Sequence, residues 1–231
     1  NFYNQLYFAM NITDQLPAKY VERHARFKNK KEYSARHIDL NNIEKHAADF
    51  ATVYNAAWSQ HNEGKTITKE DMMETFMAMK PIIDESIIWF AYYKDEPIAM
   101  WINIPDLNQY FKYFKGKFGL WQKLQLLRMK YKGSCKRFTG IAFGAIPKYQ
   151  ALGIDAFMIG EGSKFIQAAR AYERYEMGWT GDWNPRMLNI YKGLGGNQSR
   201  QLVTYRFIFE DKHPFERHPI MDYTTTENNP S

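Results

Sequence analysis

The segment best suited to chemistry is a turn between a predicted strand and a predicted helix, at residues 144–156. Pro147 ends the strand, and a turn with a glycine, Gly153, leads into the helix. Backbone amides near residues 151–154 would be first-turn donors without intrahelical partners, so they and the helix dipole would attract an anion. Gly153 would also let a ligand approach the backbone closely. An ordinary strand-to-helix connection is the alternative interpretation.

This turn resembles a known cofactor loop. Gln150-x-x-Gly153 is similar to the Arg/Gln-x-x-Gly-x-Gly/Ala loop of the GNAT acyl-CoA N-acyltransferases, which holds the pyrophosphate of coenzyme A (CoA). In that family the preceding strand binds the pantetheine arm through its backbone. The resemblance therefore implies acetyl-CoA or another acyl-CoA as cofactor. It assigns cofactor contacts to Phe143, Gly144, Ala145, Ile146, Gln150, Ala151, Leu152, Gly153, Ile154 and Asn184.

A second, downstream match supports the first. Asn184-x-x-Met187-x-x-x-Tyr191-x-x-x-Gly195-Gly196 resembles the family segment Asn-x-x-Ala-x-x-x-Tyr-x-x-x-Gly-Phe. There the asparagine contacts the cofactor and the tyrosine often protonates the leaving thiolate, which implies an acid role for Tyr191. A core tyrosine on an amphipathic helix is the alternative.

Acyl transfer to an amine also needs a group that accepts the amine's proton. Glu176, on a predicted short strand, is our candidate base, and a surface carboxylate at a strand end is its alternative. Asp182 is a weaker candidate, since its Gly-Asp-Trp-Asn context is typical of a turn. Four tryptophans are candidates for an acceptor pocket or for the core: Trp58, Trp101, Trp179 and Trp183.

Two positions depart from the family pattern. Asp155 stands where glycine or alanine is usual, and its charge would suit the helix dipole but repel a pyrophosphate. Gly196 replaces the usual phenylalanine. These departures favour a second hypothesis, a catalytically silent GNAT-fold module that binds a ligand or partner.

Residues 107–137 form a basic segment with nine Lys and Arg residues and no Asp or Glu. Because the whole chain has a net charge of +6, the remainder is net negative. Within the segment, Leu120, Leu124, Leu127 and Tyr131 form a narrow apolar helical stripe. One interpretation is a solvated insert whose helix packs on the core. The other is an anionic partner, such as cofactor phosphates, an acidic substrate, a membrane surface or RNA.

Composition and motifs exclude several classes. The 231 residues are 45% hydrophobic and 24% charged, which is typical of a globular protein. The longest apolar run, 87–93, is far below the ~18 residues of a membrane span. The histidines and the single Cys135 show no metal-binding pattern, so no metal is expected. P-loop and nucleophile-elbow motifs are also absent from the sequence. The lone cysteine and the lack of a signal-peptide pattern favour a cytoplasmic location.

The predicted elements alternate between helix and strand. Two helices come first, the second capped by Thr68 and Asp71 and ended by Pro81. A hairpin over 86–104, the basic insert, a strand over 138–146 and a helix over 150–172 follow. A strand over 175–180, a helix between Asn184 and Gly195, and a strand over 202–210 complete the order.

We therefore predict one α/β domain with the GNAT-like acyl-CoA N-acyltransferase fold: a mixed, mostly antiparallel sheet with helices on both faces. Residues 1–32 are interpreted as a strand and charged linker that end a preceding domain, 33–211 as the GNAT-like domain and 212–231 as a tail. The chain resembles the C-terminal half of two-domain GNAT-like proteins of mostly unknown substrate, which share Pro105-Asp106-Leu107-Asn108.

The function that this resemblance implies is a CoA-dependent N-acyltransferase, acetyltransferase-like, that acts on a primary amine. The acceptor is a small molecule or a peptide of unknown identity. An aminoacyl-tRNA-dependent transferase of the same fold is a further alternative, suggested by the basic insert.

Overall fold

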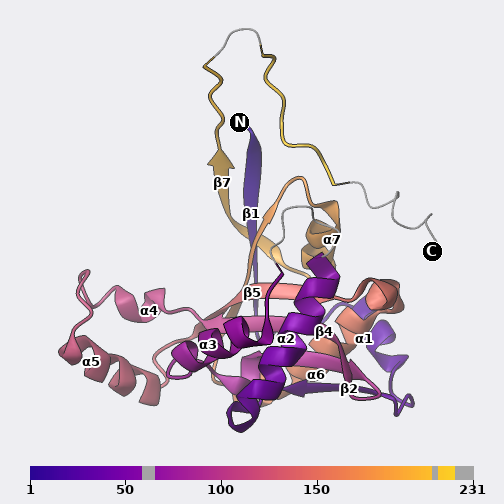
Figure 1. Ribbon diagram of the computed structural model, residues 1–231, viewed down its shortest axis with the longest axis horizontal. Helices are drawn as coiled ribbons and strands as arrows, with labels where there is room; N and C mark the ends of the chain where they lie inside the picture. Colours follow the sequence, from indigo (N-terminus) through magenta and orange to yellow (C-terminus); the bar gives the residue numbers. More distant parts are fainter. Residues whose placement is uncertain (59–65, 210–212, 222–231) are drawn as a thin grey trace. The chain divides into compact units, whose positions relative to one another are not determined.

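The computed structural model describes residues 1–58, 66–209 and 213–221, which fall into two compact units (Figure 1). The first unit combines Asn1–Met10 with the chain from Glu176 onward, and the second is Asn11–Tyr175. No helix within the described ranges is long and apolar enough to cross a membrane. The predicted mixed α/β fold with mostly antiparallel strands is confirmed.

The second unit is built on four strands in the order β2-β3-β4-β5, each antiparallel to its neighbour. The strands are β2 (Tyr33–His37), β3 (Trp89–Tyr93), β4 (Glu96–Pro105) and β5 (Arg137–Ala145). The predicted hairpin joins β3 to β4 through Lys94 and Asp95, which both have positive φ. That conformation matches the twist of the strands it joins. Strand β2 was not predicted as an element, because its five residues lack a clear alternating pattern.

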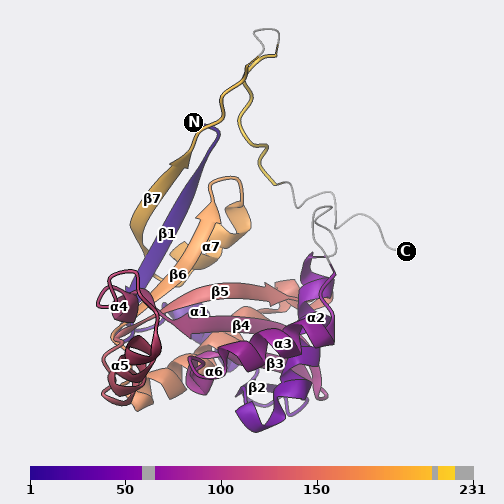
Figure 2. The ribbon, with the colours of Figure 1, turned by 60° about the vertical axis from the view of Figure 1, so that its left-hand side comes forward.

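Helices α2 (Ile43–Trp58) and α3 (Lys69–Met79) cover one face of this sheet (Figure 2). Thr68 and Asp71 form the predicted capping box of α3, with Asp71 N donating to Thr68 Oγ1 at 3.1 Å. The link between the two helices is held by Asn55, whose side chain makes two hydrogen bonds to the backbone of Ile67.

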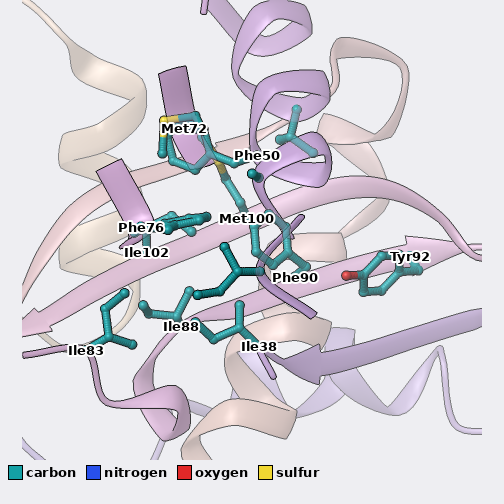
Figure 3. Packing of buried hydrophobic residues seen from close by; sticks show 13 residues of the cluster. Ile38, Phe50, Met72, Phe76, Ile83, Ile88, Phe90, Tyr92, Met100 and Ile102 are labelled. Carbon is teal, nitrogen blue, oxygen red and sulfur yellow. The ribbon is translucent and has the colours of Figure 1, made fainter. Parts of the chain in front are cut away.

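The core lies between this helix pair and the sheet (Figure 3). Phe90 and Tyr92 of β3 and Met100 of β4 point into it and are almost fully buried. Phe50 of α2 and Phe76 of α3 pack against one another there, with ring centroids 6.1 Å apart. Alternation along β3 sends the intervening residues to the opposite face.

The opposite face is covered by helix α6 (Ile154–Ala169), on which helix α1 (Ala18–Ala25) packs. Gly162 of α6 gives room to the sheet, since a Cβ there would lie 2.9 Å from the ring of Trp101. The prediction of a linker over 17–32 was wrong, because this stretch contains helix α1. Contact with α6 supports this helix: His24 lies on Gly160, and its Nε2 is 2.6 Å from the Glu161 carboxylate.

The basic insert contains helices α4 (Asn108–Phe111) and α5 (Leu120–Tyr131). Asp106 fixes its start. The Asp106 carboxylate accepts hydrogen bonds from Arg137 of β5 and from the backbone N of Asn108, at 2.7 Å and 3.1 Å. The Pro105-Asp106-Leu107-Asn108 stretch thus has a structural role, because Asp106 connects the insert to β5.

Among its described residues, the first unit holds three strands in the order β6-β1-β7 and one helix. They are β1 (Tyr3–Asn11), β6 (Arg174–Gly181), β7 (Asn197–Thr204) and α7 (Pro185–Gly193). β1 pairs antiparallel with β7, from Tyr3 opposite Thr204 to Ala9 opposite Asn197. The final strand was predicted at 202–210 and instead lies several residues earlier. Its residues are nearly all exposed, so no apolar alternation marked it.

Candidate functional site

The candidate anion site is the turn from β5 into α6. A 3-10 helix, η3 (Pro147–Leu152), follows β5, and α6 begins at Ile154, not at residue 150 as predicted. Gly153 is the N-cap of α6 with φ +84°, a left-handed conformation that favours glycine. The free N–H groups of the first helical turn therefore belong to residues from Ile154 onward. This turn can present backbone donors to an anion.

Gln150 has a structural role in the turn. Its Nε2 donates to the carbonyl oxygen of Ala145 at 2.8 Å, so the side chain ties the turn to the end of β5. Ile146 N continues the β5 ladder by donating to Ile98 O at 2.9 Å. These bonds hold the turn rigidly against the sheet. The predicted cofactor contact of Gln150 stays a prediction.

Strand β5 is the more open partner of the β4–β5 pair. All residues from 139 to 146 are at least partly exposed, whereas Ile98, Met100 and Ile102 of β4 are buried. Phe143, Gly144 and Ala145 lie on this open stretch. The close approach of Trp58 explains Gly144, because a Cβ there would lie 2.6 Å from the indole. The geometry suits a ligand that binds along the backbone of β5.

Arg23 is a candidate that the sequence did not reveal. A Cβ built on Gly153 would lie 3.6 Å from the Cβ of Arg23, so this side chain runs past the turn. Asp155 of α6, one of the two departures from the family pattern, is half-buried and interacts with Tyr20, which is on α1 like Arg23. Burial, and next the charge of Asp155, raise the pKa of the Tyr20 phenol, while Arg23 opposes them. Helix α1 thus brings an arginine to the turn that precedes the unusual carboxylate.

More cations lie beside aromatic rings at the β2, β3 and η3 end of the second unit. Tyr149 of η3 is 6.1 Å from the ring of Tyr93, which is 4.8 Å from that of Tyr33. A lysine Nζ lies within 6 Å of each ring; the lysines are Lys148, Lys94 and Lys30. Such pairs place positive charge over apolar surface. This end of the unit therefore suits a ligand with phosphates and a flat ring.

Three predicted residues belong to the first unit. Asn184 caps α7 as predicted, its side chain accepting from Met187 N at 3.1 Å. Glu176 lies on β6 and accepts a hydrogen bond from Ser199 Oγ at 3.0 Å. Tyr191 is buried, and its hydroxyl donates to the carbonyl oxygen of Met177. Burial raises the pKa of this phenol, so it stays protonated at neutral pH.

Gly195 and Gly196 end α7 as predicted. Gly195 has φ +83°, and the two glycine N–H groups donate to Lys192 O and Tyr191 O, both at 3.0 Å, which is a Schellman motif. A Cβ at Gly196 would lie 2.9 Å from Tyr191 O and from Met177. Close packing against β6 thus explains why this chain has glycine there.

The tryptophans do not form one pocket within the second unit. Trp58 faces Gly144 on the α2 side of the sheet, whereas Trp101 faces α6 and donates to Tyr175 Oη at 2.9 Å. In the first unit, Trp183 stacks on His218 with centroids 4.7 Å apart. Asp182 has a structural role in its turn, since its carboxylate accepts from Arg217 at 2.6 Å.

Comparison with solved structures defines the class. The chain superposes on a GCN5-related N-acetyltransferase from Sphaerobacter thermophilus with a TM-score of 0.51 and 11% identity, over 87% of this chain and 50% of that one. It superposes equally well, at 13% identity, on the GCN5-related glucosamine N-acetyltransferase region of a fungal multi-domain GH3 beta-N-acetylglucosaminidase, over 86% of this chain and 20% of that one. The chain therefore has the GCN5-related N-acetyltransferase fold, as the sequence predicted.

A relative in sequence is more specific. A bacterial ceramide synthase of Caulobacter vibrioides (strain NA1000 / CB15N) is 27% identical over 177 residues. The match covers 74% of this chain and 44% of the relative, so the chain spans less than half of that protein's length. No protein-family model matches the chain.

Proposed function

We propose that this chain forms part of a CoA-dependent N-acyltransferase that acylates the primary amine of a long-chain lipid. The similarity to a ceramide synthase carries this proposal, because a ceramide is the fatty amide of a long-chain amino alcohol. The fold supports it, since it is shared with N-acetyltransferases. A fatty acyl-CoA and a long-chain base would then be the two substrates.

The open backbone of β5 and the turn at Gly153 would bind the cofactor. The pyrophosphate would lie at the start of α6, where backbone N–H groups, the helix dipole and Arg23 all favour negative charge. The pantetheine arm would run along Phe143–Ile146, which remain partly exposed. Arg23 would offset the repulsion between Asp155 and the phosphates, because its side chain passes Gly153, two residues before Asp155.

In the reaction, the neutral amine attacks the thioester carbonyl. A carbon–nitrogen bond forms, the carbon–sulfur bond breaks, and the amine loses a proton while the CoA thiolate gains one. We assign the base role to Glu176 and the acid role to Tyr191. The assignment of Tyr191 rests on the sequence resemblance, and that of Glu176 on its place on a short strand, β6.

Acyl transfer tests the function directly. We expect the full-length enzyme containing this chain to convert a fatty acyl-CoA and a long-chain 2-amino-1,3-diol to the amide, with release of free CoA. Mass spectrometry measures the amide, and a thiol reagent measures CoA. The buried Cys135, whose pKa burial raises, should react slowly with that reagent. Cofactor binding without turnover on any amine would instead favour the catalytically silent module.

Arg23→Glu tests the proposed phosphate site. We expect the wild-type chain to be stabilised by CoA, by about 2.7 kcal/mol at a hundred times the dissociation constant. Arg23→Glu should weaken CoA binding by about tenfold or more, because it places a second negative charge at the turn. Calorimetric titration with CoA measures both variants.

Arg26→Glu is the matched control. Arg26 is exposed at the end of the same helix, and it is not among the residues next to Gly153. Its substitution by Glu changes the net charge by the same amount as Arg23→Glu. Equal loss of affinity in the two variants would show a general charge effect. Unchanged affinity in Arg23→Glu would remove Arg23 from the site.

A further inference from the structure

Helix α5 carries its apolar stripe on the outside of the protein. Leu120, Leu124, Leu127 and Tyr131 are all exposed, and Tyr131 is 94% exposed. Trp121, beside them, is 78% exposed. Spacings of three and four residues place the four stripe residues on one side of the helix. The stripe itself therefore does not pack on the core.

The helix is held in place by its other side. Leu126, the one buried residue among those of α5, points inward to a cavity of about 230 Å³ that Tyr110 and Cys135 also line. Lys130 Nζ donates to the carbonyl oxygens of Pro81 and Ile83 at 2.7 Å and 3.3 Å. These contacts fix α5 with its stripe turned to solvent, so the exposure is a consequence of the fold.

Cations flank the exposed stripe. At about 100° per residue, Lys123 and Lys130 lie on one side of it and Arg128 on the other. The whole insert has nine cations and no acidic residue, and it exposes further aromatic rings at Tyr113 and Phe118. An apolar strip with aromatic residues between rows of cations is typical of helices that lie in a membrane interface.

We propose that α5 docks the protein on an anionic lipid bilayer, lying in the plane of the interface with its stripe among the acyl chains. Its twelve residues span about 18 Å, too short for a hydrocarbon core of about 30 Å, so the helix lies on the membrane. RNA would match the cations and the aromatic rings, but it offers nothing to the three exposed leucines. The membrane matches all three groups of residues.

This surface is independent of the proposed acyl transfer. Anionic phospholipid would attract the cations of the insert. The leucines and Trp121 would add the apolar contribution. If the acceptor is also a long-chain lipid, docking would place the enzyme where that lipid resides.

Vesicle sedimentation tests the proposal. The full chain is mixed with vesicles of phosphatidylcholine alone or with about 30% phosphatidylglycerol. We expect cosedimentation with the anionic vesicles, at least tenfold weaker binding to the neutral ones, and a decrease as salt rises. Brominated acyl chains should quench tryptophan fluorescence in the wild type, and much less in Trp121→Phe.

Two pairs of substitutions separate the contributions. Lys123→Glu with Arg128→Glu should weaken vesicle binding more than tenfold, and so should Leu124→Gln with Leu127→Gln. All four side chains are exposed, and circular dichroism verifies folding. Lys31→Glu with Lys192→Glu makes the same charge change at exposed sites outside the insert and should leave binding unchanged.

Some results would overturn the proposal. One is equal binding to neutral and anionic vesicles. Another is full binding by the leucine variant. Retention on single-stranded RNA that exceeds vesicle binding and is unaffected by the leucine substitutions would assign the surface to RNA instead. If the wild-type protein binds anionic vesicles but shows no acyl transfer, the proposed function is contradicted and the membrane proposal is not.

Discussion

Tyr191→Phe is expected to lower the turnover of acyl transfer by roughly 10² or more, with CoA affinity nearly unchanged. The phenol is buried and protonated at neutral pH, as an acid for the thiolate must be. Its proton is bound to the Met177 carbonyl in this structure, so the acid role requires that hydrogen bond to open during the reaction. Removing the hydroxyl keeps the ring that packs near Phe8, with centroids 5.7 Å apart.

A second readout separates chemistry from structure. Loss of the buried bond to Met177 should lower the free energy of unfolding by about 1 to 2 kcal/mol, whether or not Tyr191 is the acid. Urea unfolding measures that loss. Tyr205→Phe is the control, because Tyr205 is exposed and should change neither quantity. A turnover within a factor of about three of wild type, together with the stability loss, would make Tyr191 a structural donor only.

Elements with local signals were predicted well from the sequence. The Thr68–Asp71 capping box, the Asn184 cap and the Gly195-Gly196 stop are each specified by residues a few positions apart. The β3–β4 hairpin also depends on a short turn between two apolar runs. Such signals do not require knowledge of what the element packs against.

Features that depend on distant partners could not be predicted. Helix α1 has only eight residues, and its place is set by Gly160 and Glu161, more than a hundred residues away. The approach of Arg23 to Gly153 could not be predicted for the same reason, because the two residues are also more than a hundred positions apart in the sequence. The stripe on α5 differs from these cases, because its apolar residues were recognised in the sequence. The sequence did not show that the fold would bury the other side of the helix and leave the stripe exposed.

The candidate site shows the same division. Motif spacing indicated the turn at Gly153, and the structure gives that residue the left-handed conformation that explains the glycine. Motif spacing could not show that Gln150 hydrogen-bonds Ala145 or that Gly196 lies against Met177. A family pattern thus indicated which residues to consider as site candidates, whereas the contacts of each side chain required the fold.

Asp49→Ala is expected to lower the free energy of unfolding by about 3 kcal/mol. Asp49 is a buried carboxylate of α2 that accepts hydrogen bonds from Tyr92 Oη at 2.6 Å and Lys45 Nζ at 2.5 Å. The ring of His46 lies at 3.6 Å, and its Nε2 accepts the backbone N–H of Asp39, so its proton is on Nδ1, toward Asp49. Alanine would leave the buried Tyr92 hydroxyl without its acceptor.

The pH dependence of unfolding tests whether the ionised carboxylate of Asp49 stabilises the fold. Burial acts to raise the pKa of Asp49, but the nearby His46 Nδ1 and the hydrogen bonds from Lys45 and Tyr92 outweigh it and lower the pKa below its usual value. A lowered folded-state pKa contributes stability above the unfolded pKa of about 3.9, and that stability is lost as the pH falls through the folded value. Urea unfolding from neutral to acidic pH should show a smaller loss of stability in Asp49→Asn than in wild type, because other carboxylates with lowered pKa values, such as Glu161, contribute in both. Asp95→Asn is the control, because Asp95 is exposed in a turn; it should lower the free energy of unfolding by at most about 1 kcal/mol. If Asp49→Ala lowers the free energy of unfolding by no more than this control, the buried network around Asp49 contributes little to stability.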